Sequence, residues 1–256
     1  MQQSAPPRQT PQHHAHRPPA PLRLPARLPS RTLVLPILMY HRVDLLEPTQ
    51  PAITRRLTVT PTEFADQMEW LRRAGYRTVT QRQVFRALEQ GARLPRHPVL
   101  ITFDDGYRDV LGKASPVLRR LRMHATEYVI TGRVSGADPS FLTWPELRLL
   151  EWRGVEIGSH TVDHVSLTAL DDRRALWELR ASRTALERHL RHPVQWFAYP
   201  FGAEDARVVA LVRRAGYVLA VTTHAGILQS AANPLELRRI EILDTTTVPE
   251  LAALLG

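Results

Sequence analysis

The sequence predicts an α/β fold in which parallel strands form a barrel and helices cover its outside. Short apolar segments typical of buried strands alternate with amphipathic helical segments along most of the chain, and this regular alternation favours a parallel barrel over an antiparallel sandwich. The length of 256 residues suits one barrel-sized domain. Polar side chains follow several of the expected strands, where barrels of this kind build their sites.

Residues 1–31 differ in composition from the rest of the chain. They are rich in Pro, Arg, Gln and His, and no acidic residue occurs before Asp44. Such a segment cannot bury enough apolar surface to offset its conformational entropy, so we expect a disordered basic tail at 1–31 and one folded domain at 32–256. We find no apolar stretch of signal-peptide length near the start and none long enough to span a membrane.

The first strand and the first helix carry clear local signals. A strand is expected at 33–39, where Pro36 indicates an edge or an irregular start. A helix is expected at 61–74, because Thr60 is a suitable N-cap, a proline occupies the first helical position, and Glu63 completes a capping box.

The remaining elements continue the alternation. Apolar and β-branched runs predict strands at 76–80, 99–103, 125–130, 155–157, 194–198, 217–221 and 239–242. Helical spacing, with capping residues at several starts and glycines after several ends, predicts helices at 81–90, 115–122, 143–154, 171–190, 205–214 and 248–255.

The strand at 99–103 ends abruptly at Asp104, Asp105 and Gly106. One interpretation is a turn, in which aspartate accepts backbone N–H bonds and glycine supplies a positive φ. In the other, the two carboxylates divide the chemistry, so that one holds a divalent cation and the other stays free as a base. The motif alone does not choose between them.

Two histidines, His160 and His164, form a second cluster. At i and i+4 they lie on one side of a helical turn and are close enough to share a cation, although a pair of surface histidines would have the same spacing. His160 also follows the strand at 155–157, so it lies at a strand end. Two imidazoles and one carboxylate leave a coordination position open for water, which is typical of a catalytic zinc site.

Several polar residues come just after the end of an expected strand, and a parallel barrel would gather them on one rim. They are His41, Asp104, Asp105, His160 and Tyr199. His224 follows the strand at 217–221 and belongs to the same rim, where a hydrogen-bonded structural role is equally consistent with its position.

Three segments resemble, in order, motifs of the polysaccharide deacetylases, carbohydrate esterase family 4. They are 102–106, 160–164 and 199–202, and the resemblance extends over about 35–243. It implies a distorted (β/α) barrel, with 32–256 as the catalytic domain. It also implies a metal-dependent hydrolase that removes N-acetyl groups from an N-acetylglucosamine-containing polysaccharide. The family suggests the cell envelope or the exterior of the cell, although no signal peptide is visible.

The resemblance also implies roles for individual residues. The metal, expected to be Zn²⁺ or another first-row transition metal, would be held by Asp105, His160 and His164. Asp104 would act as the base, and the backbone N–H of Phe201 would help to bind the oxyanion. Tyr199 and Pro200 would contact the substrate.

The sequence departs from the family pattern at two places. Many members carry an arginine two residues before the motif proline, where this chain has Ala198, and we expect Arg239, or as a second choice Arg238, to supply that charge. The C-terminal Leu-x-His of those members is also missing. The poly-N-acetylglucosamine deacetylases of biofilm systems place this histidine near the start, in a stretch similar to 38–41. The chain resembles that branch, with His41 as the expected general acid.

Two alternatives stay open: a non-catalytic, metal-containing glycan-binding protein, and a related hydrolase of another linear or cyclic amide. Retention of both aspartates favours the enzyme, because binding alone would not need the free carboxylate. The net charge of +9 suits an anionic partner, so the basic tail is expected to suit an anionic polymer or membrane surface; no specific nucleic acid is expected. Without cysteine, any bound metal depends on His and carboxylate ligands.

Overall fold

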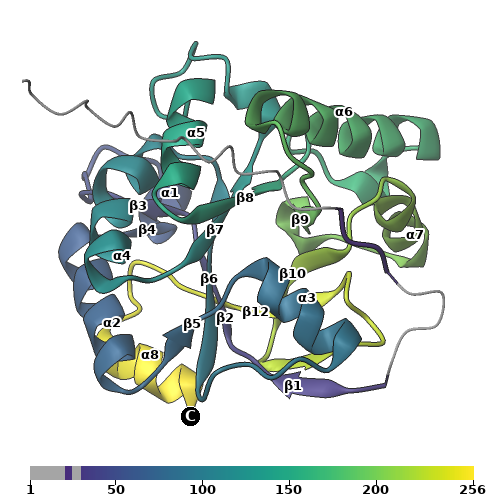
Figure 1. Cartoon of the computed structure of the whole chain (residues 1–256). Helices are drawn as coiled ribbons and strands as arrows, with labels where there is room; N and C mark the ends of the chain where they lie inside the picture. The colour runs from purple at the N-terminus through teal and green to yellow at the C-terminus, as the bar shows by residue number, and fades with distance from the viewer. Residues whose placement is uncertain (1–20, 25–29) are drawn as a thin grey trace, which may run out of the picture.

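Seven parallel strands form a closed barrel in the computed structural model, which describes residues 21–24 and 30–256 (Figure 1). Around the barrel the order is β2, β12, β10, β9, β8, β7 and β6, and pairing of β6 with β2 closes it. The bounds are β2 Ile37–Tyr40, β6 Pro98–Asp105, β7 Ala125–Val129, β8 Val155–Ser159, β9 Trp196–Ala198, β10 Leu219–Ala225 and β12 Leu237–Glu241. A short strand, β5 (Arg77–Thr78), pairs with β6. The predicted parallel barrel is confirmed.

Helices surround the barrel, with α2, α4 and α8 on one side and α6 and α7 on the opposite side (Figure 1). Their bounds are α1 Ala52–Arg56, α2 Pro61–Arg73, α3 Gln81–Gln90, α4 Ser115–Leu121, α5 Trp144–Trp152, α6 Asp172–Leu190, α7 Ala206–Arg214 and α8 Val248–Leu255. The predicted N-caps are present: Thr60 accepts the Glu63 N–H, and Asp171 accepts the Arg174 N–H at 2.8 Å. Among the described residues, the bond from the Thr60 N–H to the Glu63 side chain that would complete the predicted capping box is not formed. A π-helical turn at Val110–Ala114, which was not predicted, precedes α4.

The first predicted strand is in fact two strands. β1 (Thr32–Val34) pairs antiparallel with β11 (Leu228–Ser230) outside the barrel, and β2 enters the barrel after Pro36. Proline has no N–H to donate to a sheet, whereas its carbonyl still accepts the Leu100 N–H at 3.0 Å. The chain can therefore change sheets at this residue. The short parallel pair β3 (Arg42–Val43) and β4 (Thr58–Val59) was not predicted either.

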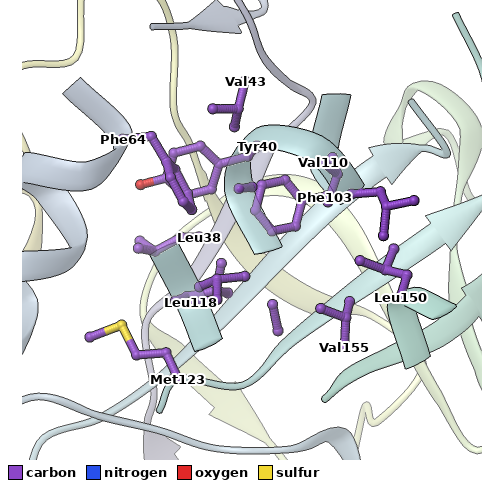
Figure 2. Packing of buried hydrophobic residues seen from close by; sticks show 14 of the residues in the cluster. Leu38, Tyr40, Val43, Phe64, Phe103, Val110, Leu118, Met123, Leu150 and Val155 are labelled. Carbon is purple, nitrogen blue, oxygen red and sulfur yellow. The ribbon is translucent and has the colours of Figure 1, made fainter. Parts of the chain in front are cut away.

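Alternation along β6 places its side chains either against the helices or inside the barrel. Phe103 faces the helices and packs on Tyr40 and Phe64, with ring centroids 5.5 and 5.8 Å away, in the cluster shown in Figure 2. The next residue, Asp104, points inward, where it meets Arg239 of β12. Burial of the apolar residues on the outer face of β6 thus fixes the orientation of the first motif aspartate.

The predicted disordered tail lies mostly outside the described residues and stays a prediction. Of the part that is described, Leu22 contacts the chain next to the start of β9: its N–H donates to Gln195 Oε1 at 2.6 Å, and its carbonyl accepts Gln195 Nε2 at 2.7 Å. Within the described ranges, no helix has both the length and the apolar composition needed to cross a membrane.

Candidate metal and catalytic site

Asp105, His160 and His164 come together at the carboxyl ends of two barrel strands. Asp105 is the last residue of β6, and His160 directly follows β8. Asp105 Oδ1 lies 3.6 Å from His160 Nε2 and 3.5 Å from His164 Nε2, and one possible ligand atom from each residue lies within 4.8 Å of the others. The three residues that were predicted to be metal ligands therefore lie close together in the structure.

The chemistry of this group fits a divalent metal ion. Asp105 Oδ1 is buried and has no hydrogen-bond partner among the described residues, so its lone pairs are available to a cation. His160 Nδ1 lies 2.8 Å from the Ala198 carbonyl oxygen, which can only accept, so the ring proton sits on Nδ1 and the Nε2 lone pair is free. Burial lowers the pKa of His160 to about 3 and also lowers the pKa of His164, which favours the neutral, metal-binding form of both rings.

Asp104 and Arg239 form a buried, bidentate ion pair inside the barrel. The Arg239 guanidinium donates to Asp104 Oδ1 at 2.8 Å and to Oδ2 at 2.7 Å, and it also donates to the Thr222 carbonyl at 2.7 Å. Burial by itself would raise the pKa of Asp104, but the charge and hydrogen bonds of Arg239 lower it to about 2. Arg238 instead donates to the Ala225 carbonyl, so Arg239 is the arginine that pairs with Asp104.

The two neighbouring aspartates have opposite environments. Burial, together with the negative charge of Asp104, raises the pKa of Asp105 to about 6, although His41 acts in the opposite direction. Asp104 already has a fixed cationic partner, whereas Asp105 lacks one. A divalent ion would supply the positive charge that Asp105 needs to remain ionised in a buried place.

His41 and Phe201 also lie at this end of the barrel. His41 directly follows β2, its Nδ1 is buried with no hydrogen-bond partner among the described residues, and its charge acts on the pKa of both aspartates. The Phe201 ring centroid lies 4.6 Å from that of His164, and its side chain is largely exposed. Both residues therefore lie at the same end of the barrel as the candidate metal ligands, and their acid and oxyanion roles stay predictions.

Tyr199 and Pro200, the two residues predicted to contact the substrate, lie in the core beside the site. Both are buried, and the Tyr199 ring packs against Phe197, with centroids 5.0 Å apart, in a cluster between the barrel and its helices. Alternation along the strand turns the Tyr199 side chain away from the barrel interior; the predicted substrate contact stays a prediction. His224, the other rim histidine, faces Glu204 at 3.5 Å.

Backbone strain is concentrated at the site. Among the described residues, seven that are not glycine have a positive φ, and four of them belong to the site segments. They are Asp105 (80°), Thr161 (67°), His164 (54°) and Phe201 (61°). Left-handed backbone costs free energy for such residues and persists only where the surroundings enforce it, which is a common property of functional sites.

Two buried glutamates that the sequence did not single out hold the site loops. Glu178 of α6 accepts the N–H groups of Val162 and Asp163, at 2.9 and 3.1 Å, between the two histidines. Glu127 of β7 accepts the Gly106 N–H at 2.9 Å, and burial raises its pKa well above the usual range. A charged residue within an apolar strand was the available signal for Glu127, whereas Glu178 lies in an ordinary charged helix.

We expect Glu178→Ala to weaken zinc binding by about 10- to 100-fold, the usual cost of removing a group that orients metal ligands. The reason is that the Val162 and Asp163 N–H groups lose the acceptor that holds the histidine loop. Titration of the metal-free protein with zinc measures the effect. Glu187→Ala is the matched control, because Glu187 forms the i,i+4 pair with Arg183 on the same helix. Equal zinc affinity in both variants would contradict the positioning role.

Comparison with known proteins agrees with this geometry. A family model described as polysaccharide deacetylase matches residues 91–220. A protein of Bacillus subtilis (strain 168), YxkH, which is named as a polysaccharide deacetylase, is 31% identical over 208 residues, covering 81% of this chain and 71% of the relative.

Two further relatives are also deacetylases by name, and one of them names its substrate. The poly-beta-1,6-N-acetyl-D-glucosamine N-deacetylase of Escherichia coli (strain K12) is 23% identical over 83% of this chain, which spans little more than a third (37%) of that enzyme. The solved structure of the Streptococcus pyogenes deacetylase PplD in complex with acetate is 29% identical, with a TM-score of 0.81, and covers 89% of this chain and 100% of its own.

Proposed function

Because this chain belongs to the polysaccharide deacetylase family, we propose that it removes N-acetyl groups from an N-acetylglucosamine-containing polysaccharide and releases acetate, with a divalent metal ion as cofactor. The observation that carries the proposal is the pairing of two neighbouring carboxylates with different partners: Asp104 with Arg239, and Asp105 with two neutral histidines. The name of the E. coli relative supports the substrate class and the reaction, and the name of the S. pyogenes protein supports deacetylation.

The metal would be held by Asp105, His160 and His164, and Zn²⁺ suits two imidazoles and one carboxylate with a position left open. When bound, such an ion polarises the amide carbonyl and lowers the pKa of water. Proton transfer and binding of the oxyanion would be carried out by side chains and backbone groups of the chain itself.

Asp104 is the proposed base. Its low pKa keeps it ionised at neutral pH, and although both oxygens accept bonds from Arg239, a carboxylate oxygen has a further lone pair that can take a proton from water. Arg239 acts through Asp104, because it fixes the orientation of that carboxylate and keeps it negatively charged.

His41 and Phe201 are proposed to serve the leaving group and the oxyanion. As water adds to the carbonyl carbon, the N–H of Phe201 would donate to the developing oxyanion. When the carbon–nitrogen bond breaks, His41 would give a proton to the departing amine, so that acetate and a free amino sugar result. The Nδ1 atom of His41 is buried and has no hydrogen-bond partner in the described part of the chain, which supports a role for this ring in the reaction.

The proposal is tested by acetate release from N-acetylglucosamine oligosaccharides, measured with zinc-loaded protein, with protein stripped by a chelator, and with stripped protein reloaded with zinc. We expect release that is lost on stripping and restored by zinc. Full activity after verified stripping would refute the metal requirement. Oligosaccharide binding without release would favour a non-catalytic binding protein, and hydrolysis of a different amide alone would favour the related hydrolase.

A further inference from the structure

Four planar side chains form a stack beside Asp105. The Arg42 guanidinium lies 4.8 Å from the Tyr107 ring centroid, the Tyr107 and Phe141 rings stack at 4.9 Å, and the Arg133 guanidinium lies 5.1 Å from the Phe141 centroid. Burial raises the pKa of Tyr107, and the negative charge of Asp105 adds to this shift. The stack therefore begins two residues after the candidate ligand Asp105 and has one guanidinium at each end.

The two guanidiniums differ in their charge balance. Arg42 donates to Asp109 at 2.9 Å and lies 3.4 Å from Asp44, so its charge is neutralised locally. Arg133 has no carboxylate oxygen within 4.0 Å among residues 21–24 and 30–256, and the rest of the sequence contains no Asp or Glu. Asp138, which Arg133 influences electrostatically, instead accepts the Ser140 N–H at 2.9 Å. Arg133 thus has no direct ion-pair partner among the described residues.

The backbone around Arg133 is fixed to the histidine loop. Thr131 N–H donates to the Thr161 carbonyl at 3.1 Å, and Gly132 N–H donates to the Val162 carbonyl at 2.9 Å. A Cβ at Gly132 would lie 2.6 Å from that same Val162 oxygen, so this close approach requires glycine. These backbone contacts place Arg133 directly after the segment that is bonded to the loop between His160 and His164.

We propose that Arg133 is an anion-binding subsite of the active centre, and that it recognises a carboxylate or phosphate group carried by the glycan close to the N-acetyl group that is removed. This inference rests on the proposed deacetylase function. A guanidinium forms strong, charge-assisted pairs with both kinds of anion, and stacking on Phe141 holds its plane in place. A neutral N-acetylglucosamine homopolymer offers no group that would use this charge.

The decisive comparison measures the zinc-loaded parent, Arg133→Gln and Arg133→Lys with three substrates. The substrates are a neutral N-acetylglucosamine oligosaccharide, one containing the carboxylate of N-acetylmuramic acid, and one carrying a 6-phosphate. For an anionic substrate that fits, Arg133→Gln should raise KM about tenfold more than for the neutral one, with kcat little changed, because the lost contact binds ground and transition states alike. Arg133→Lys should raise this KM less than Arg133→Gln does, since lysine keeps the positive charge but lacks the planar guanidinium group.

Arg119→Gln is the matched control. Arg119 of α4 also stacks on an aromatic ring, at 5.7 Å from Trp152, and no carboxylate oxygen of the described chain lies within 4.0 Å of it. Trp152 ends α5 just before β8 begins, so this pair lies toward the end of the barrel opposite the site. Arg119→Gln should therefore leave all three KM values unchanged. Added salt should raise the KM of the parent for the anionic substrate and narrow its difference from Arg133→Gln.

The outcomes separate the subsite from the proposed function. Equal KM changes for neutral and anionic substrates in Arg133→Gln, or loss of its zinc, would overturn the subsite. The carboxylate and phosphate arms show which anion is used. If no substrate releases acetate, the proposed function fails. Binding of the anionic oligosaccharides to the parent and to Arg133→Gln then decides the subsite alone, and equal dissociation constants would refute it.

Discussion

Asp104→Asn is expected to lower turnover by about 10²-fold or more while zinc stays bound, since general-base catalysis contributes on that scale. Asparagine keeps the shape of the side chain but cannot accept the proton of water. The metal ligands are unchanged, because Asp104 contacts Arg239 and is not one of the three clustered donors. Acetate release and zinc content, measured on the same preparation, check both halves of the expectation.

This variant must be separated from a loss of stability. Asp104→Asn leaves the Arg239 guanidinium buried without its counter-charge, and breaking a buried pair in this way costs about 3–5 kcal/mol of unfolding free energy. Asp104→Asn combined with Arg239→Gln removes both charges, so it should recover part of the stability but none of the turnover. Asp105→Asn should instead lose zinc. Deacetylation at the parent rate by zinc-loaded Asp104→Asn would show that Asp104 is not the base.

Much of the fold could be predicted from sequence because its signals are local. The N-cap at Thr60 and the apolar run before Asp104 each depend on a few neighbouring residues, and both appear where expected. The division of 33–39 into two strands was missed, because β1 pairs with β11 nearly two hundred residues away. The proline within the segment showed where the break would fall, but a distant pairing partner leaves no local signal.

The candidate metal ligands could be predicted from the sequence, whereas the residues that orient the site were harder to predict. Strand ends indicated that one aspartate and two histidines would meet, and the family resemblance assigned Asp105, His160 and His164 as the ligands. The Arg239–Asp104 pair joins residues 135 positions apart, and only the inward orientation of β12 shows that Arg239, and not Arg238, reaches the carboxylate. Tyr199 shows the reverse case, because a motif residue can be conspicuous in sequence and still point into the core.

His164→Ala is expected to lose zinc and acetate release together, while the protein remains folded. Removal of one of three ligands leaves a two-donor group that competes poorly with water for the ion. His164 suits this test better than His160, because the His160 ring is buried and hydrogen-bonded to the Ala198 carbonyl, so its loss would also disturb packing. Elemental analysis after dialysis measures zinc, and thermal unfolding of the metal-free proteins shows whether the fold is intact.

His224→Ala is the control for that experiment, because it removes another imidazole from the same rim. His224 faces Glu204 and does not belong to the clustered donors, so its removal should leave both zinc content and turnover close to those of the parent. The contrast between the two variants tests ligand identity and not the general effect of losing a rim histidine. Stoichiometric zinc in His164→Ala would exclude His164 as a ligand. Loss of zinc in His224→Ala would indicate that His224, on β10, is itself a ligand.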